Sequence, residues 1–129
     1  MYKKVSLFVT TLLISSISCF AQDTKCTDFK VGTFEYSDPR FSEWKVSRTD
    51  TLQIEKSSVS GVEIYSSIKW ISDCNYILTY KKVLNTDVDP SDFIGKTIEV
   101  KIIKTESDRY TCHSKSDVMD LEIEMVKVD

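Results

Sequence analysis

The side chains in this sequence with the most evident chemical potential are its cysteines and its single histidine. Cys112 and His113 are adjacent, and Cys26 and Cys74 are the other cysteines beyond residue 21. Neighbouring side chains of a β-strand point to opposite faces, so Cys112 and His113 cannot converge on one substrate or ion. A zinc site needs three or four converging ligands. We therefore expect a buried Cys112 beside an exposed His113, and no metal site.

Two groups of carboxylates offer weaker alternatives. Residues 85–92 carry side-chain oxygens at alternate positions, as a calcium loop does, but Pro90 and Lys96 stand where such a loop needs Gly and a bidentate Glu. Glu122 and Glu124 are two residues apart, about 7 Å on one strand face, a spacing that glycosidases use and that solvated strands also show. No serine has an identifiable base. We predict no catalytic residue, no metal and no cofactor.

Aromatic side chains are the stronger lead to a binding site. Trp70, Tyr76 and Tyr80 fall on the apolar phase of two consecutive predicted strands, and Trp44 shares the apolar phase of an earlier one. The interior of an eight-stranded barrel is either filled by side chains or holds one small ligand. We predict that Trp44, Trp70, Tyr76 and Tyr80 line a small-ligand site, with a solid core as the alternative.

Strict alternation of apolar and polar residues predicts strands rather than helices. It is clearest over residues 62–70, 98–102 and 119–125. Weaker strands are predicted at residues 29–36, 44–49, 51–56, 76–83 and 109–114. The one long connection, residues 84–96, could contain a helical turn with Asp89 as N-cap and Pro90 at its first position.

Short connections between the other strands favour an antiparallel meander. Links of two to five residues join successive strands as antiparallel neighbours. About eight such strands hide their edges by closing into a barrel or by folding into two packed sheets. We expect an all-β, up-and-down fold in residues 22–129, and we favour the barrel over the two-sheet sandwich.

The meander predicts which cysteines pair. If Cys26 lies at one end of the fold, the fourth connection, which holds Cys74, returns to that same end. Cys112 stands three residues into a strand, roughly 10 Å away, which is beyond the usual Cα separation of a disulfide. We predict a Cys26–Cys74 bridge and a free Cys112.

The first 21 residues resemble an export signal. Lys3 and Lys4 precede an uncharged apolar stretch of 13 residues, and Ala21 ends a segment typical of signal-peptidase cleavage. A membrane-spanning helix needs about 20 residues, so we favour export over an anchor, with lipidation at Cys19 as a further alternative. Export places the protein in the periplasm, on the outer membrane or outside the cell.

Cleavage leaves a mature chain of 108 residues with 15 basic and 20 acidic side chains, which argues against a nucleic-acid partner.

Three segments carry a resemblance to a known group of proteins. Residues 26–34, 61–70 and 73–80 resemble those of short exported bacterial β-rich proteins of no established activity, some labelled DNA topoisomerase IV. The resemblance covers most of the mature chain and transfers no catalytic or ligand motif. A topoisomerase needs a DNA-sized basic surface and nucleotide-binding machinery, which this acidic chain does not offer.

Two functions remain as expectations. The first is a lipocalin-like, non-enzymatic binder of a small apolar molecule in the cell envelope. The second is a protein-interaction or inhibitor module that contacts its partner through loops such as residues 84–96. The oligomeric state is left open.

Overall fold

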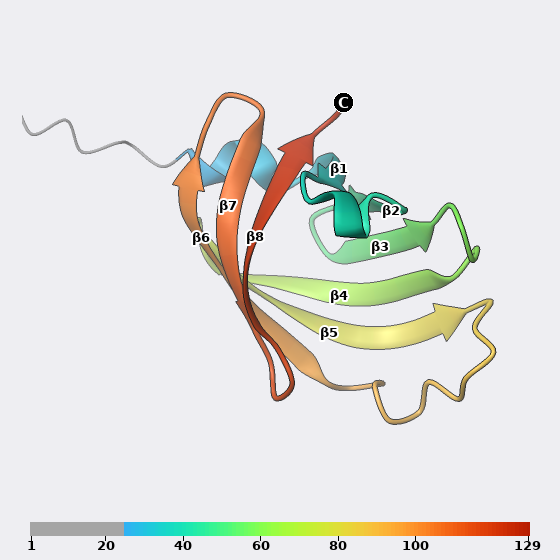
Figure 1. Cartoon of the computed structure of the whole chain (residues 1–129). Coiled ribbons are helices and arrows are strands. Elements are labelled where there is room, and N and C mark those ends of the chain that lie inside the picture. Colours follow the sequence, from blue (N-terminus) through green and yellow to red (C-terminus); the bar gives the residue numbers. More distant parts are fainter. Residues whose placement is uncertain (1–24) are drawn as a thin grey trace, which may run out of the picture.

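A computed structural model describes residues 25–129, and the predicted leader, residues 1–21, and Cys19 lie outside the described residues. A short 3-10 helix precedes eight strands (Figure 1). The elements in chain order are η1 (Cys26–Phe29), β1 (Gly32–Tyr36), η2 (Pro39–Phe41), β2 (Trp44–Arg48), β3 (Leu52–Ser57), β4 (Glu63–Ser72), β5 (Asn75–Leu84), β6 (Thr97–Thr105), β7 (Arg109–Lys115) and β8 (Asp120–Lys127).

The strands form a closed, antiparallel, up-and-down barrel. Each strand pairs with its neighbour in sequence, and β8 closes the barrel by pairing with β1, with Phe34 opposite Lys127. Figure 1 shows β6, β7 and β8 running at a steep angle to β3, β4 and β5, as the strong twist of a small barrel requires. Closure gives every strand a paired neighbour on both sides over at least part of its length. The predicted all-β fold is confirmed, and the barrel rather than the sandwich is the observed form.

Alternation along the strands separates an interior from an outer face. On β6, Ile98, Val100 and Ile102 are buried, whereas Glu99 and Lys101 are exposed. The same period on the other strands places their buried apolar side chains in one cluster. The start of β8 departs from it, because Leu121, in the inner phase, is 44% exposed. Its most enclosed members are Cys26, Phe29, Phe34, Val46 and Tyr110.

The two ends of the barrel differ. One end, which we call the disulfide end, carries η1 and the tight β2–β3, β4–β5 and β6–β7 connections. There the sulfur atoms of Cys26 and Cys74 lie 2.06 Å apart and their Cα atoms 5.2 Å apart, so the predicted pairing is confirmed. Lys30 Nζ also lies 3.0 Å from Asp73 Oδ1. The other end, the loop end, carries residues 37–43, 58–62, 85–96 and 116–119.

The N-terminal segment differs from the predicted strand at residues 29–36. Phe29 belongs to η1, is 1% exposed and packs edge-on against Tyr110 at 5.3 Å, so burial of its ring decides its conformation. The strand begins only at Gly32, which has φ +142°. A Cβ at Gly32 would meet Lys127 Cε at 2.7 Å, so this turn into β1 favours glycine.

Two connections contain an Asp-Pro pair, and the turn expected in residues 84–96 is present at Pro90. Pro90 starts a hydrogen-bonded turn, in which Phe93 N donates to Pro90 O at 2.9 Å and Ser91 N to Asp89 Oδ1 at 3.0 Å. The turn does not continue as a helix. The same Asp-Pro chemistry gives a 3-10 helix at η2 instead, where Asp38 is the N-cap and Pro39 occupies the first turn.

Candidate functional site

A cavity of about 160 Å³ lies in the lumen of the barrel. Apolar side chains of β5, β6 and β8 and polar side chains of β2, β3 and β7 form its wall. The lining residues are Tyr36, Arg48, Gln53, Glu55, Tyr76, Leu78, Tyr80, Ile98, Val100, Tyr110, Cys112, Ser114, Met119, Ile123 and Met125. The cavity is therefore amphipathic.

Arg48 forms the floor of this cavity on the side of the disulfide end. Its Nε and Nη2 atoms donate to Gln53 Oε1 at 3.1 and 3.0 Å, and its Nη1 donates to the Phe29 carbonyl at 2.9 Å. Nη2 also lies 2.9 Å from the hydroxyl of Tyr110 and 3.2 Å from that of Tyr76. The two hydroxyls are 3.2 Å apart. We call these five residues the Arg48 cluster.

Local topology explains why the cluster forms. Arg48 ends β2 and Gln53 lies opposite it across the tight β2–β3 turn, with both side chains on the inner face. Tyr76 and Tyr110 occupy inner positions on β5 and β7, close to the disulfide end. The fold of η1 then brings the carbonyl of Phe29 within reach.

The charge of Arg48 is held by aromatic rings and neutral acceptors. Its guanidinium carbon lies 4.5 Å from the ring centroid of Phe34, 5.0 Å from that of Tyr76 and 5.8 Å from that of Tyr110, which are cation–π distances. Burial raises the pKa of Tyr76 well above its ordinary value. The phenol therefore stays neutral at physiological pH. Arg48 is 3% exposed and remains protonated.

A second polar pair lies toward the loop end. The hydroxyl of Tyr36 on β1 donates to Oε1 of Glu55 on β3. Burial is the main cause that raises the pKa of Glu55, and the Tyr36 hydrogen bond and the charge of Arg48 oppose it. Burial and the neighbouring Glu55 also raise the pKa of Tyr36.

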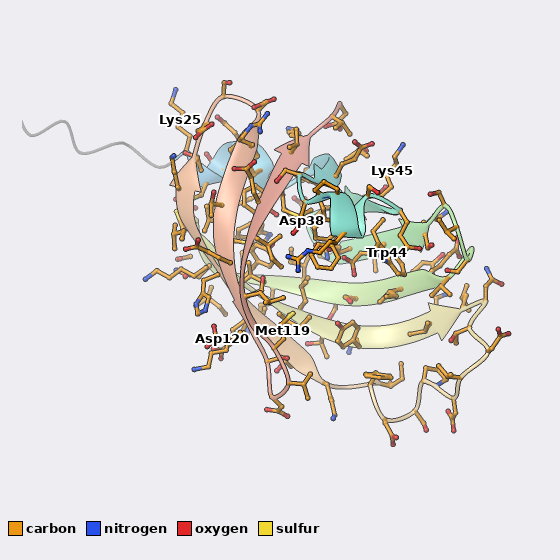
Figure 2. All side chains as sticks on the ribbon, in the orientation of Figure 1. Lys25, Asp38, Trp44, Lys45, Met119 and Asp120 are labelled. Carbon is orange, nitrogen blue, oxygen red and sulfur yellow. A yellow bond between two sulfur atoms is a disulfide. The ribbon has the colours of Figure 1, made fainter. Side chains whose placement is uncertain are left out.

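Beyond this pair a second recess of about 200 Å³ leads toward the loop end. It shares Tyr36, Glu55, Met119 and Ile123 with the inner cavity. Its other lining residues are Phe41, Trp44, Ile64 and Leu121. Figure 2 labels Trp44 and Met119, which belong to β2 and to the loop before β8. The Tyr36–Glu55 hydrogen bond thus lies where the two spaces adjoin.

The four aromatic residues predicted to line a ligand site do not all meet. Tyr76 and Tyr80 line the inner cavity, whereas Trp44 lines only the outer recess and an external groove. Trp70 packs against Tyr76 at 4.6 Å under the ammonium of Lys30, and it lines none of these spaces. Its buried Nε1 has no hydrogen-bond partner.

Sequence reasoning missed the polar part of the site, namely Tyr36, Arg48, Glu55 and Tyr110. A signal was present, because Arg48 shares the inner phase with Trp44 and Val46 on β2. A charged residue in phase with apolar neighbours indicates either a strand end in solvent or a buried polar network. In this barrel, Arg48 belongs to a buried polar network.

Cys112 and His113 lie as predicted on opposite faces of β7. Cys112 is 2% exposed, is the free cysteine of the described residues and lines the cavity. His113 contacts Asp120 on the outer side of the β7–β8 hairpin, where Figure 2 shows Asp120. Within residues 25–129, no cluster of three or more His, Cys, Asp or Glu side chains could hold a metal ion.

Comparison of the chain with family models, with curated proteins and with solved structures gives no match. In residues 25–129, no helix has the length and apolar character needed to cross a membrane. The fold and the lumen are thus the observations from which a function can be argued.

Proposed function

We propose that this chain is an exported, non-enzymatic binding protein that holds a small, mostly apolar molecule in the lumen of its barrel. The observation that carries this proposal is the 160 Å³ cavity between β2, β3, β5, β6, β7 and β8. The proposed role is that of a lipocalin-like carrier or sensor in the cell envelope, whose ligand sits inside a closed barrel. Tyr76 and Tyr80, which face inward, contribute to the wall of this cavity.

The size of the cavity limits the ligand. An engineered cavity of about 150 Å³ lined by apolar residues binds benzene, whereas sites for drug-sized molecules occupy about 300–1,000 Å³. The inner cavity of this barrel is therefore matched to a molecule of about one aromatic ring. Leu78, Ile98, Val100 and Met125 supply the apolar wall that such a molecule needs.

Export is supported by two observations. The first 21 residues have the charge and hydropathy of a signal peptide. Cys26 and Cys74 lie at disulfide distance, and stable disulfides are typical of oxidising compartments. Both features fit a periplasmic or secreted carrier, and an outer-membrane lipoprotein attached through Cys19 is the alternative.

A second candidate function is a protein-interaction or inhibitor module. It is favoured by apolar side chains exposed on the loop end, among them Val59 at 82%, Val88 at 66%, Phe93 at 51% and Val118 at 88%. Exposed apolar groups of this kind often mark contact surfaces. The two candidate functions use different binding residues, since these four exposed side chains lie outside the inner cavity.

The experiment is native purification followed by intact mass measurement under native conditions, together with titration of toluene by ligand-observed NMR. We expect a retained small molecule, or binding of toluene to the stripped protein. Ile98→Phe, which fills the cavity, should abolish binding. Ile103→Phe, a change on the outer face where the side chain is 44% exposed, should leave it intact.

Overpacking a core costs about 1–3 kcal/mol of stability. Circular dichroism of both variants therefore checks that the barrel is retained. A native protein that is purified empty and binds neither toluene nor a polar probe of the same size would overturn the carrier proposal. Equal loss of binding in folded Ile98→Phe and Ile103→Phe would show that the lumen is not the site.

A further inference from the structure

The three arginines of the chain differ in how their charge is balanced. Arg40 Nη2 lies 2.7 Å from Asp38 Oδ2, and Arg109 contacts both Asp108 and Glu124. Both of these arginines are at the surface. Arg48 is the buried one, and within residues 25–129 it has no carboxylate at salt-bridge distance. A buried charge is costly unless an opposite charge or several hydrogen bonds balance it.

The floor of the cavity also has more hydrogen-bond donors than acceptors. Arg48 Nη1 has two hydrogens and one acceptor among the described residues, the carbonyl of Phe29. Both phenol oxygens lie within hydrogen-bond distance of Arg48 Nη2, and only one of the two phenols can donate to the other, so one phenol hydrogen remains. The hydroxyl of Ser114, which also lines the cavity, has the Cys112 thiol, at 3.8 Å, as its one hydrogen-bond partner within residues 25–129.

We propose that the lumenal ligand carries a carboxylate, and that the Arg48 cluster binds it through the guanidinium and the spare phenol hydrogen. This inference rests on the proposed function and names the class of ligand. The carboxylate accepts hydrogen bonds only and carries the charge that Arg48 lacks, so it matches both features of the floor. A ring-sized apolar body then fills the space between Leu78, Ile98 and Val100.

The position of Glu55 in the lumen sets the orientation of the bound ligand. Gln53 and Glu55 are two residues apart on the inner face of β3, about 7 Å along the strand. Glu55 therefore lies farther from the disulfide end than Gln53, which contacts Arg48. The Glu55 carboxyl accepts from Tyr36, whereas Arg48 presents donors, so the carboxylate of the ligand lies at Arg48 and its apolar body faces Glu55.

The test compares ring-sized probes of similar shape on the full protein at neutral pH. Benzoate carries the charge, benzamide is its neutral counterpart, and toluene has no polar group. We expect benzoate to bind about tenfold more tightly than benzamide or better, since a hydrogen bond between charged groups is roughly twice as strong as one between neutral groups. Binding is measured by calorimetry and by ligand-observed NMR.

The outcomes separate the two proposals. Toluene binding with benzoate no tighter than benzamide overturns the carboxylate inference and leaves the lumenal carrier standing. Failure of all three probes, together with an empty native protein, overturns both. Binding of benzoate to folded Ile98→Phe as tightly as to the parent chain places the carboxylate elsewhere and also overturns the inference.

Two variants test the charges directly. Arg48→Gln should reduce the preference for benzoate over benzamide to near unity, with the fold checked by NMR. Where that variant does not fold, Glu55→Gln decides the question, because it keeps an acceptor for Tyr36 and removes the carboxyl group, whose ionised form repels a carboxylate. It should tighten benzoate about threefold or more and leave toluene unchanged. An unchanged benzoate affinity in Glu55→Gln would contradict the assigned orientation.

Discussion

The Nη2 atom of Arg48 on β2 donates to the hydroxyl of Tyr110 on β7, 2.9 Å away, although 62 positions separate the two residues. The ring of Tyr110 in turn meets Phe29 and Phe34 edge-on, at 5.3 and 5.9 Å. The hydrogen bond connects β2 with β7, and the Tyr110 ring connects both to η1. The polar floor of the cavity therefore also holds these three elements together.

These contacts predict that loss of Arg48 strongly lowers the free energy of unfolding. Arg48→Met leaves the Phe29 carbonyl and Gln53 without their buried donor, so we expect the free energy of unfolding to fall by about 2–4 kcal/mol. Urea denaturation measures it. Arg40→Met is the matched control, because Arg40 is exposed and paired with Asp38, and it should change stability far less than Arg48→Met does. Equal effects of the two changes would show that the buried network adds nothing.

The bridge between Cys26 and Cys74 gives the second prediction. It closes a loop of about 49 residues, for which chain entropy predicts a stabilisation of about 4 kcal/mol. The double variant Cys26→Ser, Cys74→Ser should lower the unfolding free energy by that order, measured by urea denaturation without reductant. Reductant should destabilise the parent chain by a similar amount and leave the double variant unchanged. A shift of the double variant on reduction would point to another bridge.

Most of the fold was predictable from the sequence because one period governs it. Alternation over residues 98–102 and 119–125 predicts strands whose inner residues are Ile98, Val100 and Met125, as observed. Short connections then force neighbouring strands to pair, and the same argument places Cys26 and Cys74 at one end. These features depend on local spacing, which a sequence shows directly.

The site was predictable only in part because it depends on distant polar contacts. Phase predicts correctly that Tyr76 and Tyr80 face the lumen, but it does not show how deep a side chain lies and therefore does not separate Trp44 and Trp70 from them. The partnership of Arg48 with Tyr110 needs the closed barrel and the fold of η1. No spacing rule in the sequence brings those two residues together.

Glu55 predicts a pH dependence of stability. Burial raises its pKa in the folded barrel above the value near 4.3 of an unfolded chain. The folded state therefore binds this proton more tightly, and the contribution of Glu55 to stability falls as pH rises from the unfolded pKa through the folded one. Across that window, the stability of Glu55→Gln relative to the parent chain should rise with pH, and then level off.

Glu63 provides the control for Glu55 because its pKa is shifted in the opposite direction. A hydrogen bond from Lys56, followed by one from Tyr65, lowers the pKa of Glu63. Its stabilising contribution is present above the unfolded pKa and is lost on acidification. Relative to the parent chain, Glu63→Gln should therefore lose stability as pH rises. Urea denaturation of all three proteins between pH 3 and pH 8 measures both slopes, and slopes of one sign would refute the assignment of Glu55.

Cys112 offers a chemical readout of the lumen. Burial is the main cause that raises the pKa of its thiol to about 11 from an ordinary 9.0, so the reactive thiolate is about a hundredfold scarcer than in an unfolded chain. Alkylation by iodoacetamide at pH 8, followed by mass measurement of the peptide that contains Cys112, should be at least that much slower in the folded protein than in urea. Because the thiol lines the cavity, saturating toluene should slow it further, whereas folded Ile98→Phe should show no additional protection by toluene. Rapid alkylation of the folded protein, unaffected by toluene, would mean that the lumen is open to solvent at Cys112 and does not hold an apolar ligand there.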